Sequence, residues 1–190
     1  MKRSTRSSRT WSSPVLSAAL AALALAASAA SDWSDFAPAG GRFAVALPGR
    51  PAVEYDATVT PVGTVHMTKY WLRVGDVLLA VEMHDLPPVA SALLSDDMVL
   101  DQAREGLLDD VGGTQIESKS LDYQGAPARD FRYRVAGAGH LEERVLAVLV
   151  DARLYLVTGM ARAPVTDPDV ARFFTSFRWW RETSSEAATR

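Results

Sequence analysis

A two-residue turn between alternating apolar residues constrains the fold of this chain more than any other stretch. Gly75-Asp76 separates Val65–Arg73 from Val77–Met83, and a Gly-first pair suits the type II′ turn of a tight β-hairpin. One face of this hairpin is then apolar and the other holds an ion pair, so the register is chemically consistent. The apolar face carries Val74/Val77, Leu72/Leu79, Tyr70/Val81 and Thr68/Met83, and the other carries Trp71/Ala80, Lys69/Glu82 and Met67/His84.

Several further runs have the alternation and the flanking turn residues of β-strands. Pro48-Gly49 and Gln124-Gly125 are among the turns that separate them. Hairpin connections dominate, which favours a mostly antiparallel sheet. The predicted strands are Phe43–Leu47, Glu54–Thr60, Gln115–Asp122, Ala128–Val135, Leu141–Val150 and Leu154–Met160.

Two segments have the pattern of helices that pack on a sheet. The first is predicted over Asp96–Val111, with Ser95 or Asp96 as its N-cap and Gly112-Gly113 at its end. The second begins at Thr166, which is the predicted N-cap. Residues 86–95 are predicted to be a loop that contains prolines. The apolar stripes are Leu100, Ala103, Leu107, Leu108 and Val111 on the first helix, and Phe173, Phe174 and Phe177 on the second.

These elements predict one α+β domain over residues 31–181, a mostly antiparallel sheet of about six to eight strands with two helices packed on it. Residues 31–42 are a short lead-in, from which Trp33 and Phe36 are available to pack back on the domain. Residues 182–190 are polar and are predicted to be a disordered tail.

The first thirty residues have the pattern of a cleavable export signal. Val15–Ala27 is apolar but too short and too rich in alanine to be a membrane span. Ala27-Ser28-Ala29 is the small-residue pattern that signal peptidase recognises, so we expect cleavage near Ala29 or Ala30 and release into a periplasmic or extracellular space. The positive residues that precede the apolar run are Lys2, Arg3, Arg6 and Arg9.

Charge and cysteine content narrow the classes of partner. Without the four basic residues of the signal, 16 Lys and Arg stand against 23 Asp and Glu, a formal net charge of −7. This balance argues against nucleic acid or anionic lipid as the main partner. The chain has no cysteine, so it has no disulfide, no thiol chemistry and no site for a lipid anchor after the signal.

Four segments carry a resemblance to a known fold family. Phe43–Pro51 resembles the opening F-x-V-x-L-P-G-x-P of small exported bacterial domains with the PsbP/DcrB/Mog-type fold. Leu121–Asp130 is similar to their central hairpin, Arg153–Val157 to their penultimate strand, and Phe173–Phe177 to their closing F-F-x-S-F. The resemblance spans about residues 40–178. It implies an antiparallel sheet flanked by helices and an accessory role, because PsbP-like members assist a larger complex and Mog-type members bind another protein.

The histidines raise the question of a metal site. His66 faces Asp85 in the predicted hairpin, His84 lies with Glu82 on the opposite face, and His140 begins a later strand. No pair of them has the close spacing of a zinc motif, and partly solvated histidines with ordinary hydrogen bonds are the more common case. We therefore predict no metal and no cofactor; if a site existed, its ligands would be His66, Asp85 and His140.

Charged residues on a later hairpin have two interpretations. Arg132 and Arg134 share one strand face, and Glu142 and Arg144 follow on the next strand. An anion-binding patch would use the arginine forks, whereas a ladder of cross-strand ion pairs needs no ligand. The ladder is the more common arrangement and is our prediction.

Two surface features are candidates for partner contact. Asp109 and Asp110 lie in the last turn of the first helix, where the helix dipole disfavours negative charge; Asp101 and Glu105 extend them into an acidic strip. Trp179-Trp180 places two rings on opposite faces if the segment is extended, so one ring is a candidate anchor and the other packs. Solvated surface and simple packing are the alternatives for these residues.

No motif for nucleophilic or phosphate chemistry is present in the mature chain. We therefore predict a non-enzymatic, exported accessory domain that binds another envelope or secreted protein through Asp109, Asp110, Trp179 and Trp180. The alternative is a domain that binds a small ligand or a metal in a pocket between sheet and helix, which would need convergent polar groups. A hydrolase would need His66 or His140 beside a serine and a carboxylate.

Overall fold

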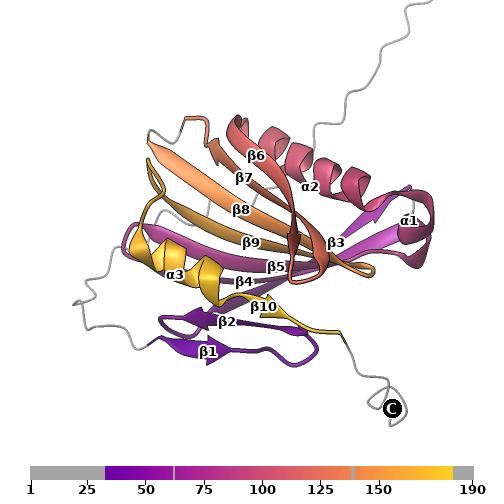
Figure 1. Cartoon of the computed structure of the whole chain (residues 1–190), viewed down its shortest axis with the longest axis horizontal. Coiled ribbons are helices and arrows are strands. Elements are labelled where there is room, and N and C mark those ends of the chain that lie inside the picture. The colour runs from indigo at the N-terminus through magenta and orange to yellow at the C-terminus, as the bar shows by residue number, and fades with distance from the viewer. Residues whose placement is uncertain (1–32, 62, 138–139, 182–190) are drawn as a thin grey trace, which may run out of the picture. The chain divides into compact units, whose positions relative to one another are not determined.

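A computed structural model describes residues 33–61, 63–137 and 140–181. The predicted signal segment (1–30) and the predicted tail (182–190) lie outside these residues. A seven-stranded antiparallel sheet forms the centre of the domain, in the order β3-β4-β5-β9-β8-β7-β6 (Figure 1). Its strands are β3 (Ala52–Thr60), β4 (Gly63–Val74), β5 (Val77–Asp85), β6 (Thr114–Tyr123), β7 (Ala126–Arg134), β8 (Leu141–Val150) and β9 (Arg153–Arg162).

A second, small sheet and three helices complete the domain. The small sheet has the order β1-β2-β10, and the helices connect or follow strands of the large sheet. The α+β class and the antiparallel arrangement are confirmed, but the sequence predicted neither the second sheet nor a third helix. These elements are β1 (Ser34–Phe36), β2 (Phe43–Leu47), β10 (Arg178–Trp179), α1 (Pro88–Leu93), α2 (Asp96–Val111) and α3 (Pro168–Ser176).

The predicted hairpin register is confirmed over its whole length. Val74 faces Val77, Leu72 faces Leu79 and Lys69 faces Glu82 in β4 and β5. Gly75 has φ +56°, and Asp76 does not share a positive φ, which matches the signs of a type II′ turn. Local turn chemistry and the two-residue period of side chains were therefore sufficient to set this pairing.

The central strands require cover on both faces of the large sheet. Val145 to Val150 are all buried in β8, and β9 is buried almost throughout. On one face, α2 packs Val99 and Leu100 against Phe131 and other residues of β7, β8 and β9. On the opposite face lie α3 and the small sheet (Figure 1). They pack Phe173, Phe177 and Phe43 into a second core. The large sheet thus lies between two different covers.

The ends of α2 follow the prediction. The Ser95 hydroxyl accepts a hydrogen bond from the Met98 N–H at 3.3 Å, and Gly112 ends the helix with φ +59°. The predicted stripe faces the core: Leu100 is buried, and Ala103, Leu107, Leu108 and Val111 are packed against it.

Two local predictions were wrong. The segment 86–95 contains α1, which starts at Pro88 and buries Ala90. Proline is tolerated in the first turn, and six residues are too few for periodicity to reveal a helix that tertiary packing holds. At α3, Asp167 rather than Thr166 is the N-cap, and its carboxylate accepts a hydrogen bond from the Asp169 N–H at 2.8 Å. Among the described residues, no helix is long and apolar enough to cross a membrane.

Gly159 in β9 sets how closely α3 approaches the sheet. A Cβ at this position would lie 2.7 Å from Val170 Cγ1 and 2.9 Å from Phe174 Cε2, both on α3. Real Cβ atoms do not approach side chains this closely, so the helix rests on the bare backbone of β9.

We predict that Gly159→Ala destabilises the protein by about 1–3 kcal/mol, because α3 must shift to admit the methyl group. Gly106→Ala is the matched control. Gly106 lies on α2, where a Cβ meets nothing within 4 Å, and the same change should stabilise by about 0.5–1 kcal/mol. Urea unfolding of both variants measures the difference, and equal effects would refute this account of the contact.

Candidate functional site

Among the residues that the structure describes, strand β3 forms one edge of the large sheet and carries an exposed apolar row. Val53 faces Tyr70 of β4, so Val53, Tyr55, Ala57 and Val59 lie on the face that α3 and the small sheet cover further in. That cover extends to Tyr70, whose ring is 5.1 Å from that of Phe36 in β1, centroid to centroid. Beyond it the side chains are open: Tyr55 is 78% exposed and Val59 is 77% exposed.

The backbone of β3 also presents hydrogen-bonding groups outward. The Ala57 N–H donates to the Asp56 carboxylate at 2.7 Å, so it takes no part in the ladder with β4. In an antiparallel strand, alternate residues direct their N–H and C=O groups to the same side. The corresponding groups of Val53, Tyr55 and Val59 therefore also point away from β4. In the described part of the chain, the edge therefore presents backbone donors and acceptors that take no part in the ladder with β4, and the Ala57 N–H among them is bonded to Asp56.

The opposite edge, β6, is protected against strand addition. Its pairing with β7 is interrupted by a shift between Gln115 and Glu117. Glu117 also pairs with Arg132 at 2.8 Å, and Lys119 stands on the same strand. Bulges and charged side chains are the usual means of blocking an edge. Strand β3 has no register shift against β4 and no lysine, so the two edges differ in their capacity to pair.

A charged cluster lies on the α2 face of the sheet, next to the part that α2 covers. The Lys69 ammonium is 2.8 Å from the Glu82 carboxylate, and His84 Nε2 is 3.3 Å from the same carboxylate. The Trp71 indole N–H donates to Glu54 of β3 at 2.8 Å. The cluster therefore links β5 through β4 to the free edge strand.

The pKa values of two carboxyl groups in this part of the sheet, Glu82 and Glu143, are shifted in opposite directions. Burial raises the pKa of Glu82, but the hydrogen bond from His84 and the charge of Lys69 outweigh it and hold that pKa at about 2. Burial raises the pKa of Glu143 in β8 to about 7, and neither Lys69 nor the Tyr133 hydroxyl that donates to it reverses the effect. Burial likewise raises the pKa of Tyr133. Chemically, the cluster can hold one proton near neutral pH.

The histidines do not come together. His66 faces Asp85 as predicted, but the Asp85 carboxylate is 2.6 Å from Arg153 Nε. His140 adjoins the start of β8, whose Leu141 pairs with the far end of β9, so it lies at the other end of the sheet from Asp85. Within residues 33–61, 63–137 and 140–181, no three His, Asp or Glu side chains are placed to hold a metal ion.

The acidic strip on α2 divides into two parts. Asp101 lies 3.0 Å from Arg129, and Glu105 lies 3.0 Å from Arg104, so these two carboxylates are neutralised. Asp109 and Asp110 are exposed at the C-terminal end of the helix. In the described part of the chain, neither makes an ion pair.

The two tryptophans point to different environments, as predicted for an extended segment. Trp179 packs against the core that contains α3, and its indole N–H donates to the Tyr123 carbonyl at 3.2 Å. Trp180 is exposed, and its backbone N–H donates to the Arg42 carbonyl at 3.0 Å. The segment belongs to the small sheet, on the opposite face of the large sheet from α2. Trp180 and the Asp109-Asp110 pair therefore do not form one surface.

The predicted ladder of cross-strand ion pairs is confirmed. Arg132 pairs with Glu117, and Arg134 lies 3.2 Å from Glu142. Arg144 binds the Asp130 carboxylate through two nitrogens at 2.8 and 3.1 Å. The guanidinium groups of these three arginines pair with carboxylates of neighbouring strands, so they are not available to bind an anion.

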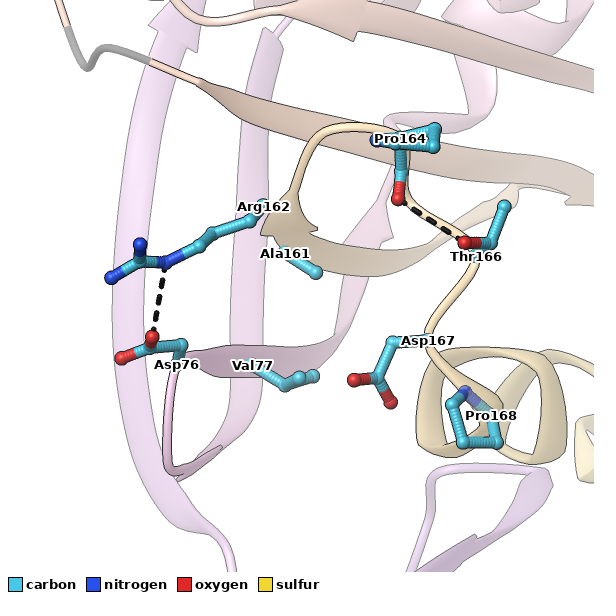
Figure 2. Close-up of a pocket in the computed structure, with 8 residues that line it drawn as sticks. All are labelled: Asp76, Val77, Ala161, Arg162, Pro164, Thr166, Asp167 and Pro168. Atoms are coloured by element: carbon cyan, nitrogen blue, oxygen red, sulfur yellow. Dashed lines mark hydrogen bonds and ion pairs between the residues drawn. The ribbon is translucent and has the colours of Figure 1, made fainter.

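One open pocket of about 420 Å³ lies where the β4–β5 turn meets the connection from β9 to α3 (Figure 2). The polar side chains that line the pocket form ion pairs and hydrogen bonds with nearby residues. Arg162 lies 3.1 Å from Asp76, the Thr166 hydroxyl donates to the Pro164 carbonyl at 3.4 Å, and Asp167 caps α3. The pocket therefore lacks a set of polar groups directed at a common point.

Comparison by sequence matches the chain to no family model and to no curated protein. Solved structures do match. The solution structure of cyanobacterial PsbP (CyanoP) from Synechocystis sp. PCC 6803 has a TM-score of 0.54 and 13% identity, over 83% of this chain and 98% of that one. PA94 from Pseudomonas aeruginosa, a protein of unknown function, has a TM-score of 0.42 and 11% identity, over 80% and 99%. The likeness to CyanoP shows a shared fold: the chain has a PsbP-type fold, as the resemblance implied.

Sequence reasoning missed the free edge and the buried carboxyl. The alternation of Val53, Tyr55 and Val59 with polar residues is visible in the sequence, but it does not tell whether the apolar side is covered. Glu142 and Glu143 are adjacent residues of the same type, so the sequence does not distinguish them, yet in a strand their side chains point to opposite faces. Both are buried, but Glu142 lies 3.2 Å from Arg134 and accepts a hydrogen bond from the Val165 N–H, whereas Glu143 lies against Tyr133 on the α2 side.

We predict that the free energy of unfolding falls as pH rises from 4.5 to about 7. In this window the folded protein keeps the Glu143 proton, whereas the unfolded chain, with the ordinary pKa of 4.5, loses it. Glu143→Gln cannot lose a proton and should remove a decline on the order of 2–3 kcal/mol. Denaturant unfolding at a series of pH values measures this. Glu142→Gln keeps the Glu143 carboxyl and should retain the decline; a decline unchanged in Glu143→Gln would contradict the assignment.

Proposed function

We propose that this chain is an exported, non-enzymatic accessory domain that binds a protein partner through the free edge of β3. The observation that carries the proposal is the combination, on one edge strand, of exposed Tyr55 and Val59 with outward backbone groups around Ala57. An extended segment of a partner that pairs with this edge would bury the apolar row and complete the hydrogen bonds. Natural proteins block such edges unless they are used, and β6 of the same sheet is blocked.

The export part of the proposal rests on the sequence of the first thirty residues. Their basic start, short apolar run and Ala27-Ser28-Ala29 pattern support cleavage and release into a periplasmic or extracellular space. The formal charge of −7 on the remaining chain supports a protein partner over nucleic acid or an anionic membrane.

The alternative of a small-ligand domain has less support. The spaces between the large sheet and its helices are filled by side chains such as Leu100 and Phe131 on one side and Phe173 and Phe174 on the other. The pocket at Asp76 and Arg162 is open, and its polar groups are paired locally. These features favour a surface over a cavity as the working part of the domain.

Site-specific photo-crosslinking tests the proposal. With p-benzoylphenylalanine at position 55, we expect a covalent product between this chain and a partner in the exported fraction of cells at native expression, identified by mass spectrometry. The same probe at position 116, on β6, is the matched control because Ile116 is also exposed, at 41%. Equal products from both positions, or none from position 55, would contradict a specific role for β3.

Charge variants define the surface further. Val59→Lys should abolish the product from position 55, because it buries an unpaired ammonium on pairing, whereas Ile116→Lys should leave it unchanged. Asp109→Lys/Asp110→Lys and Trp180→Ala test the two surfaces that the sequence indicated. Loss of the product in either of these, with Val59→Lys unaffected, would move the binding surface from β3 to α2 or to β10.

A further inference from the structure

We propose that the partner strand at the free edge is β3 of a second copy of this chain, antiparallel to the first and related to it by a two-fold axis at Ala57. This inference rests on the proposed function, since it names the partner of the same edge.

Symmetry limits the registers that two copies can adopt. In an isologous pair each residue i that faces j is matched by j facing i, and a two-fold axis perpendicular to the sheet leaves both sheet faces unchanged. Two residues that pair across the axis must therefore have their side chains on the same sheet face. Because side chains alternate between the faces along a strand, the axis must pass through a residue and not between two residues. The registers with long overlap have the axis at Tyr55, Asp56 or Ala57.

The charges of β3 distinguish these three registers. An axis at Asp56 places its carboxylate opposite the same carboxylate of the second copy. An axis at Tyr55 places Glu54 opposite Asp56. An axis at Ala57 brings no like charges together, because Asp56 then faces Thr58 and Glu54 faces Thr60 of the second copy. Like charges directly opposite destabilise a strand pair, so the register at Ala57 is favoured.

The same register matches the apolar row to itself. Tyr55 faces Val59 of the second copy, Ala57 faces Ala57, and Val59 faces Tyr55. An aromatic ring against a β-branched side chain is a favourable cross-strand pair. The residues that are most exposed in one copy thus become each other's cover, and the apolar row continues across the two sheets.

The backbone fits this pairing as well. Tyr55, Ala57 and Val59 are the residues whose N–H and C=O groups point outward, so each facing pair can exchange two hydrogen bonds. The Ala57 N–H now bonded to the Asp56 carboxylate would turn to the carbonyl of Ala57 in the second copy. The released carboxylate would accept a hydrogen bond from the Thr58 hydroxyl of the second copy. No donor or acceptor is lost in the exchange.

The first test is the oligomeric state of the purified protein. Sedimentation equilibrium in the micromolar range should show a monomer–dimer equilibrium for the wild type. Ala57→Pro removes the central donor at an edge position where proline is tolerated, and Val59→Lys adds a buried charge; each should raise the dimer Kd roughly tenfold or more. Ile116→Lys, on the other edge, should leave it unchanged. A monomeric wild type, or a dimer that Val59→Lys and Ala57→Pro leave intact, overturns the proposal.

Single cysteines test the register, because the chain has no cysteine of its own. In a glutathione redox buffer, Ala57→Cys should form a disulfide-linked dimer, since facing Cα atoms in a hydrogen-bonded antiparallel pair lie about 5.5 Å apart. Tyr55→Cys and Asp56→Cys should not, because their copies are displaced along the strand. A dimer from either of these in place of Ala57→Cys overturns the register. All three substitutions lie at exposed positions, so they leave the core unchanged.

The two proposals fail in different ways. A monomeric wild type whose position 55 crosslinks to a different protein, with loss of that product in Val59→Lys, would overturn the second copy as partner and retain the binding edge. A crosslink that Val59→Lys does not affect, together with a monomeric wild type, would overturn both.

Discussion

The requirement that β8 and β9 be covered on both faces governs the rest of this structure. Both strands are buried along nearly their whole length, and Val145–Val150 of β8 is entirely apolar, so a sheet built around them is stable only between two layers. Helix α2 supplies one layer, and α3 with the small sheet supplies the other. The bare backbone at Gly159 allows α3 to lie directly on β9. Within the described residues, neither layer extends over all seven strands, so the outer strands differ from the centre: no described segment covers the apolar row of β3, and β6 carries a bulge and charges.

The limit of the α2 layer also explains the charged cluster. Glu82 remains ionised although it is largely buried, because Lys69 and His84 both contact its carboxylate. Glu143 is buried on the same sheet face, where it accepts a hydrogen bond from the Tyr133 hydroxyl. Burial then dominates, and the carboxyl keeps its proton to about pH 7. Two glutamates on the same sheet face thus hold opposite protonation states because one has a cation in contact and the other does not.

Predictions that depended on neighbouring residues were accurate. The hairpin around Gly75, the caps of α2 and the ladder of ion pairs along β7 and β8 all formed as expected. Elements too short to have a period were missed: β1 has three residues, β10 has two, and α1 has six. The candidate metal ligands show a different limit. His66 does face Asp85, but His140 lies at the far end of the sheet, and strand order alone determines that separation.

By itself the sequence determined the α+β class, the register of the β4–β5 hairpin and the start and end of α2. Each of these depends on side-chain period, turn residues or capping groups within a few positions of one another. The tertiary structure decided which strand became the free edge and against which groups each of the two buried glutamates, Glu142 and Glu143, was placed. Both outcomes follow from contacts between segments far apart in the chain, above all the pairing of β5 with β9 that places β3 outermost. The energy of that pairing comes from burying both strands between two layers, and no local pattern in β3 or β8 encodes it.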